Sequence, residues 1–151
     1  MGILIVALVL LSISTYGVIK LKRFYFLLGY FLFSLLGITS LLPTYNDDPM
    51  LMLTTLGMMI VLAIVSFPAK KNIADYNINA EAAPLVKSFM LRSLLILTSV
   101  NIIAIFLVKL DTNLPEGMTE DMKIYPMIMH GVFAVLPLVV LYKMSRMNLS
   151  K

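Results

Sequence analysis

Five apolar segments without a deeply placed charge constrain this chain more than any other feature. Each has roughly 16 to 19 residues, close to what a helix needs to cross a hydrocarbon core of about 30 Å. Helices satisfy their own backbone amides, whereas an unpaired amide in lipid costs several kcal/mol. We therefore predict an all-α integral membrane protein, one domain over residues 1–151 that forms a bundle of five transmembrane helices. The predicted spans are residues 2–19, 24–42, 50–67, 93–108 and 124–142.

The composition fits a chain whose main solvent is lipid. Hydrophobic residues make up 60% of the 151 residues and charged residues only 13%, about half the usual charged share of a soluble domain. Cysteine is absent, which excludes a disulfide, a thiolate metal site and a cysteine nucleophile. We attribute the net charge of +4 to membrane topology, and no nucleic-acid partner is predicted.

The charges between the apolar segments alternate in sign and predict an orientation. Lys and Arg are retained on the cytoplasmic side of proteins with short loops. Placing the N-terminus outside and the C-terminus in the cytoplasm puts most of the basic residues inside and most of the acidic residues outside. The chain is thus predicted to be a multi-pass protein of a bacterial inner membrane. The inner basic residues are then Lys20, Lys22, Arg23, Lys70, Lys71, Lys87, Arg92, Lys143, Arg146 and Lys151, and the outer acidic ones Asp47, Asp48, Asp111, Glu116, Glu120 and Asp121.

The sequence allows two predictions for the start of the fourth helix. The apolar segment begins at residue 93, but Pro84 suits the first turn of a helix, so the helix could instead run from Pro84 to Leu110. The polar segment before it, residues 69–87, is the best cytoplasmic candidate for a short interfacial helix and a partner contact.

His130 and Asn101 are the most distinctive polar residues within the spans. If the fourth and fifth helices are antiparallel neighbours, the two side chains lie at similar depth. A hydrogen bond between them would contribute about 0.6 to 2 kcal/mol. We interpret the pair as a polar intramembrane contact that holds the bundle together. A role in gating, ligand contact or metal binding is the alternative.

Several methionines gather near the predicted outer face. Met127 and Met129 flank the entrance to the fifth span beside His130, and Met50 and Met52 open the third span. Thioether and imidazole groups are soft ligands that suit Cu(I). One hypothesis is therefore a copper site formed by Met127, Met129 and His130, with help from Met50 or Met52. The competing interpretation is that these methionines are apolar filler.

Pro137 and the aromatic residues of the second span each have a structural and a functional interpretation. Pro137 removes one helical hydrogen bond and predicts a helix kink in the middle of the fifth span. Small residues, including Gly29 and Gly57, predict close helix packing. Six aromatic residues in the second span could line a pocket for a quinone, a pigment or a lipid, although lipid contact or anchoring at the interface is the favoured interpretation: Phe24, Tyr25, Phe26, Tyr30, Phe31 and Phe33.

These features favour a binding or structural role over catalysis. The chain has no glycine-rich phosphate loop, zinc-ligand spacing or nucleophile elbow, so neither an enzymatic activity nor a cofactor is predicted. Ion coupling usually needs an ionisable residue deep in a span. We therefore predict a non-catalytic accessory subunit of a larger membrane complex, with membrane lipid and other membrane subunits, or further copies of itself, as partners. The alternative is a small oligomeric carrier or channel for a neutral solute or a soft metal ion.

Overall fold

The protein is built from helices. The computed structural model describes residues 2–20, 22–41, 49–68, 83–110 and 119–146, and these ranges contain no β-strand. The predicted all-α class is confirmed, and each predicted segment corresponds to one α-helix. The elements are α1 (Gly2–Ile19), α2 (Arg23–Leu41), α3 (Pro49–Val65), α4 (Ala83–Leu110) and α5 (Ile124–Arg146), with a short 3-10 helix, η3 (Glu120–Lys123), directly before α5.

Helix α4 is much longer than its apolar segment alone. It has 28 residues and begins at Ala83, so the start near Pro84 is confirmed and the helix extends about ten residues beyond the predicted span at residue 93. Proline is tolerated in the first turn because its missing N–H has no helical partner there. Residues 69–82, which hold most of the predicted interfacial helix, lie outside the described residues.

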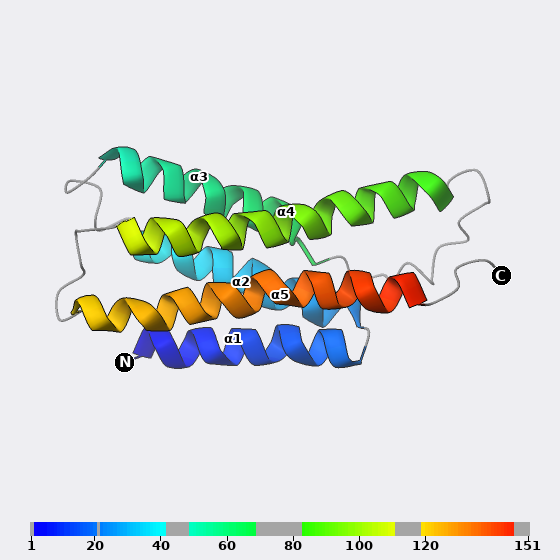
Figure 1. Ribbon diagram of the computed structural model, residues 1–151, viewed down its shortest axis with the longest axis horizontal. Coiled ribbons are helices and arrows are strands. Elements are labelled where there is room, and N and C mark those ends of the chain that lie inside the picture. Colours follow the sequence, from blue (N-terminus) through cyan, green and yellow to red (C-terminus); the bar gives the residue numbers. More distant parts are fainter. Residues whose placement is uncertain (1, 21, 42–48, 69–82, 111–118, 147–151) are drawn as a thin grey trace.

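The five α-helices form a closed ring. Each helix contacts the next in the chain, and α5 also contacts α1. Figure 1 shows that consecutive helices run in opposite directions along the long axis of the molecule. Helices α1, α3 and α5 therefore end at one end of the bundle, here called the C-terminal end. The opposite end carries η3 and is called the η3 end.

Two helices are long and apolar enough to cross a membrane by length and composition. They are Lys87–Leu110 in α4 and the segment Glu120–Met144 that contains α5. The apolar parts of the other three helices are shorter in the described ranges: Ile5–Ile19, Arg23–Thr39 and Pro49–Val65. Two such helices weakly suggest association with a membrane. Crossing by all five helices stays a prediction.

Apolar side chains lie both in the interior of the bundle and on its surface. Large apolar side chains face outward, including Ile64, which is 70% exposed, and Phe106, which is 60% exposed. Several polar side chains are buried beside the apolar core: Ser14, Ser34, Ser66, Thr98, Asn101 and His130. Every fully buried side-chain nitrogen or oxygen in the described ranges has a hydrogen-bond partner, which is the condition for burying such groups without a large penalty.

Aromatic rings from α2 and α5 fill the centre of the ring of helices. The Tyr30 and Phe133 side chains have no exposed surface. The ring of Phe133 packs edge-on against Tyr30, with centroids 4.8 Å apart, and is stacked on Phe33 at 4.5 Å. The interpretation of the second-span aromatic residues as lipid contacts is therefore wrong for Tyr30 and for the buried Phe26. The sequence identified the aromatic residues but not which of them face inward.

Glycines allow α1 and α2 to approach each other at backbone distance. A Cβ atom at Gly17 would lie 2.2 Å from the backbone nitrogen of Phe26. At Gly29 it would lie 2.0 Å from the Ser14 hydroxyl oxygen and 2.6 Å from the Leu10 carbonyl oxygen. The Ser14 hydroxyl also donates to the Phe26 carbonyl across the interface, at 3.0 Å. We call this region the glycine contact. Close helix packing was predicted at Gly29, whereas Gly17 was not singled out from the sequence.

Candidate functional site

Asn101 of α4 and His130 of α5 meet in the interior of the bundle. The Asn101 Oδ1 atom lies 3.0 Å from His130 Nδ1, and both residues are buried. The Asn101 amide nitrogen donates to the Leu97 carbonyl at 2.8 Å. Because that carbonyl can only accept, the oxygen of the amide must face the imidazole. His130 therefore carries a hydrogen on Nδ1, which it donates to Asn101.

An aromatic side chain covers the imidazole from a third helix. The ring of Phe33 in α2 packs edge-on against His130, with centroids 5.2 Å apart. This ring also stacks on Phe133, so His130 adjoins the aromatic centre of the protein. The structure thus brings the two sequence-predicted polar residues together and adds α2 to their surroundings.

Pro137 leaves a gap in the hydrogen bonding of α5 that another helix fills. In a regular helix the N–H of residue 137 would donate to the carbonyl of Phe133, but proline has no N–H. The hydroxyl of Tyr30 in α2 donates to this Phe133 carbonyl instead. One residue further on, the Thr98 hydroxyl of α4 donates to the Ala134 carbonyl at 3.2 Å. We call these two interactions the Pro137 hydrogen bonds.

The Pro137 hydrogen bonds tie α2 and α4 to the same turn of α5. Helix α5 continues across Pro137, from Ile124 to Arg146, and the predicted kink stays a prediction. Neither Tyr30 nor Thr98 was singled out as a partner of Pro137 from the sequence. A signal was present, because a proline inside a helix requires a donor for the carbonyl four residues earlier. The sequence does not say which neighbouring helix supplies it.

The proposed copper ligands lie in different surroundings. Met129 is buried in the hydrophobic core, whereas Met127 is half-buried and lines a cleft at the η3 end. His130 already bonds Asn101 through Nδ1. Of the two possible helpers, Met50 is 81% exposed and Met52 is buried. The copper site and the carrier or channel function stay predictions. Cu(I) titration of the wild type against His130→Ala tests the copper site, and equal binding by both proteins would contradict it.

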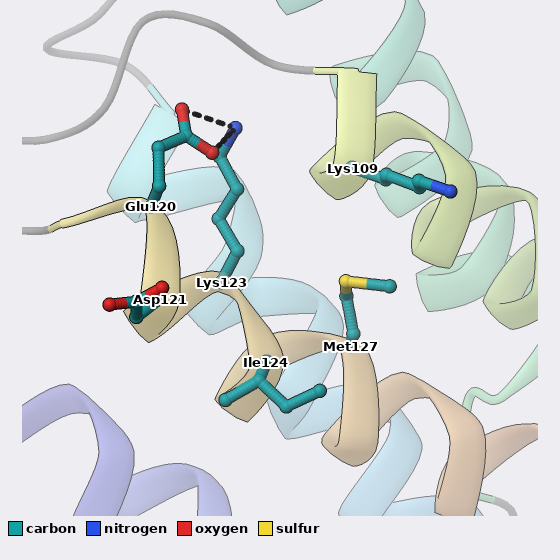
Figure 2. A pocket seen from close by; sticks show the side chains of 6 residues that line it. All are labelled: Lys109, Glu120, Asp121, Lys123, Ile124 and Met127. Carbon is teal, nitrogen blue, oxygen red and sulfur yellow. Dashed lines mark hydrogen bonds and ion pairs between the residues drawn. The ribbon is translucent and has the colours of Figure 1, made fainter.

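A cleft with charged walls lies where α4 ends and α5 begins. Its volume is about 470 Å³. The Lys123 ammonium makes a 2.8 Å ion pair with Glu120, and Figure 2 shows Lys109 on the opposite side, at the end of α4. We call it the η3 cleft; it is lined by Lys109, Glu120, Asp121, Lys123, Ile124 and Met127.

Comparisons with protein-family models, curated proteins and solved structures found no match for this chain. The functional argument therefore rests on the geometry of the chain itself.

Proposed function

We propose that all five helices cross the membrane, with the N-terminus outside and the C-terminus in the cytoplasm. The outward-facing apolar side chains and the buried polar ones support this arrangement, because lipid rather than water then surrounds the bundle. The shortest helix, α3, has 17 residues, which gives about 26 Å at 1.5 Å per residue. That length fits a core of about 30 Å once flanking residues or slight thinning of the bilayer are included.

The charges of the described residues support the same orientation. The C-terminal end carries Lys20, Lys22, Arg23, Lys87, Arg92, Lys143 and Arg146, whereas both described acidic residues, Glu120 and Asp121, lie at the η3 end. One of these lysines also links two helices, because Lys143 donates to the Val18 carbonyl at 3.0 Å. That carbonyl lies in the last turn of α1, where no helical donor is available. Basic residues at the cytoplasmic end agree with the rule for short loops.

We infer that the protein acts as a non-catalytic accessory subunit of a larger membrane complex. The observation that carries this proposal is Gly57, which is exposed on α3 and has no atom within 4 Å of a Cβ built there. Gly17, Gly29 and Gly37, in contrast, each face a close neighbour inside the bundle, and Gly131 of α5, whose surroundings are also open, is half-buried rather than exposed. Glycine weakens a helix by about 1 kcal/mol relative to alanine, and in membranes small residues let a second helix approach closely. Gly57 thus provides a contact position for a helix from another subunit.

The buried polar residues support a structural role for the interior. Asn101, His130, Tyr30 and Thr98 all bond another helix of this chain. Polar groups used in this way stabilise a helical bundle in lipid. The interior then serves to hold α2, α4 and α5 in register, while the outer surface of α3 serves for assembly.

Affinity purification in a mild detergent tests the proposal. We expect the wild-type chain to be recovered in a stoichiometric complex with other membrane proteins. Gly57→Leu fills the open position on α3 and should release the partner by steric overlap. Gly131→Leu is the matched control, because Gly131 of α5 also has no atom within 4 Å of a built Cβ, and it should leave the complex intact.

Two outcomes would contradict this function. Recovery of a monodisperse protein without any partner would rule out an accessory subunit. Release by Gly131→Leu but not by Gly57→Leu would place the partner on α5 and make the assignment to α3 wrong.

A further inference from the structure

Basic side chains gather where α1 ends and α2 begins. Lys20, Lys22 and Arg23 lie within four consecutive residues, between the last turn of α1 and the first turn of α2. Lys20 and Lys22 are exposed, and Arg23 is half-buried. Lys143 of α5 joins them, because its ammonium lies 3.0 Å from the Val18 carbonyl in the last turn of α1. We call these four basic residues the basic corner; Figure 1 shows that α1 and α5 end at the same end of the bundle.

The positive charge at this end of the bundle exceeds what acidic side chains can balance. In the described ranges the acidic residues are Glu120 and Asp121 of η3, at the opposite end. The proposed orientation assigns ten basic and two acidic residues of the whole chain to the cytoplasmic side, an excess of eight positive side chains. The two acidic residues, Asp75 and Glu81, lie outside the described residues and are already included in this count. Anionic groups from outside the chain must therefore balance the excess.

Two tyrosines set the depth of the basic corner in the membrane. Tyr16 in the last turn of α1 and Tyr25 in the first turn of α2 pack edge-on, with ring centroids 5.4 Å apart, and both are exposed. Tyrosine rings at the ends of membrane helices prefer the level of the lipid headgroups. The Lys22 ammonium lies 5.9 Å from the centre of the Tyr25 ring. In the proposed embedding, this positive charge therefore lies beside lipid headgroups and not in the water beyond them.

Lys143 keeps part of its hydrogen-bonding capacity for a ligand. An ammonium group has three N–H donors, and the Val18 carbonyl accepts from one of them. No other described residue accepts from Lys143. The bond to Val18 also holds the ammonium at the junction of α1 and α5. A charge that is already held in place loses less conformational freedom when a ligand binds.

We propose that the basic corner binds the phosphate groups of anionic phospholipids in the cytoplasmic leaflet, such as phosphatidylglycerol. The lysine ammonium groups donate charge-assisted hydrogen bonds to phosphate oxygens, and Tyr16 and Tyr25 contact the glycerol region of the same lipids. Basic residues at the cytoplasmic ends of membrane helices attract anionic lipids in this way. This inference rests on the proposed membrane embedding and orientation, and it does not depend on the partner proposed at Gly57.

A zwitterionic lipid is expected to bind the basic corner more weakly. Phosphatidylcholine has the same phosphate, but its choline cation is repelled by the basic residues. Phosphatidylglycerol carries the phosphate without that cation. The preference for phosphatidylglycerol should decrease as salt is added, because salt screens charges that are exposed to water.

Native mass spectrometry of the purified, delipidated full-length protein tests this preference. Wild-type protein offered equal amounts of the two lipids should retain mainly phosphatidylglycerol. Lys20→Gln combined with Lys22→Gln should lower the ratio of bound phosphatidylglycerol to phosphatidylcholine roughly twentyfold, because each lysine near a bilayer surface contributes about a factor of five. Lys87→Gln combined with Arg92→Gln is the matched control. It removes the same charge from exposed positions at the same end of the bundle, but on α4, and should change the ratio much less.

Three outcomes would overturn the proposal. The first is equal retention of the two lipids by the wild type, and the second is an equal loss of preference in the two double variants, which would make it a property of total charge. The third is displacement of phosphatidylglycerol by an equal concentration of soluble glycerophosphoglycerol, which would identify a free phosphate as the ligand. Resistance to carbonate extraction from membranes tests the embedding separately, and Gly57→Leu should bind lipid like the wild type. Failure of the lipid surface is therefore distinguishable from failure of the proposed function.

Discussion

Helix α1 is held to the bundle in a different way from α5. At the glycine contact, α1 and α2 approach until a single added carbon at Gly17 would lie 2.2 Å from a backbone nitrogen. Around α5, the helices are joined instead by side chains that reach across, in the Pro137 hydrogen bonds and in the Asn101–His130 pair. Both solutions are known for helices in lipid, where apolar side chains alone give little preference for protein over solvent.

The two kinds of contact tolerate different substitutions. At Gly17 the three nearest atoms are all backbone atoms, which cannot move aside as a side chain can, so this contact is sensitive to added volume. A side-chain hydrogen bond tolerates substitutions of similar shape, and its weakness is the polar group left without a partner. The following substitutions distinguish the backbone contact from the side-chain hydrogen bonds. In each case stability is measured as the free energy of unfolding in mixed detergent micelles.

The largest effect is expected at the glycine contact. Gly17→Ala should destabilise the protein by about 1 to 3 kcal/mol, the usual cost of overpacking, because the new methyl group meets the backbone of Phe26. Gly131→Ala is the control, since its surroundings are open, and it should be neutral or stabilising by up to about 1 kcal/mol. Equal effects of the two substitutions would show that α1 and α2 do not pack at Gly17.

The next effect is expected at the Asn101–His130 pair. Asn101→Leu keeps the approximate volume but leaves the buried His130 Nδ1–H unpaired, at a cost of about 1 to 2 kcal/mol. A double-mutant cycle with His130→Phe should give a coupling energy of about 0.6 to 1.7 kcal/mol. Additive single effects would mean that the two side chains do not interact.

A smaller effect is expected when the Tyr30 hydroxyl is removed. Tyr30→Phe should destabilise the protein by about 1 kcal/mol, because the Phe133 carbonyl next to the proline gap loses its donor. Tyr25→Phe on the exposed side of α2 is the matched control. In a Pro137→Ala background the helix regains its own N–H at this position, so the cost of Tyr30→Phe should fall. An unchanged cost of Tyr30→Phe in the Pro137→Ala background would show that the Tyr30 hydroxyl does not compensate for the N–H that Pro137 lacks.

The smallest effect is expected at Thr98. The Ala134 carbonyl has a second donor in the helical pattern, the N–H of residue 138, and the Thr98 bond is long at 3.2 Å. Thr98→Val should therefore change the free energy of unfolding by less than about 0.5 kcal/mol. A cost as large as that of Tyr30→Phe would show that the helical donor at residue 138 is also lost.

The sequence predicted the helices well because apolar length is a local property. Each apolar segment became one helix, and Pro84 located the start of α4 better than hydrophobicity did. The contact between Asn101 and His130 could be predicted from their positions along the two helices. Residues at similar depth lie side by side when neighbouring helices are antiparallel.

The inward-facing residues were harder to predict because they depend on the rotation of each helix about its axis. Helices that are apolar on all sides have no polar stripe to define an outer face. Tyr30 and Tyr25 lie on the same helix, yet one is fully buried and the other is 39% exposed. The contact at Gly17 and the role of Tyr30 both required knowledge of this rotation.

The orientation of the bundle in the membrane can be tested directly by cysteine labelling. The natural chain contains no cysteine, so single substitutions in intact cells react without background. With a membrane-impermeant maleimide, Met50→Cys and Thr119→Cys should be labelled at once, and Lys22→Cys and Phe67→Cys only after the membrane is permeabilised. The reverse pattern, or labelling of Lys22→Cys and Met50→Cys from the same side, would contradict the five-span arrangement with its N-terminus outside.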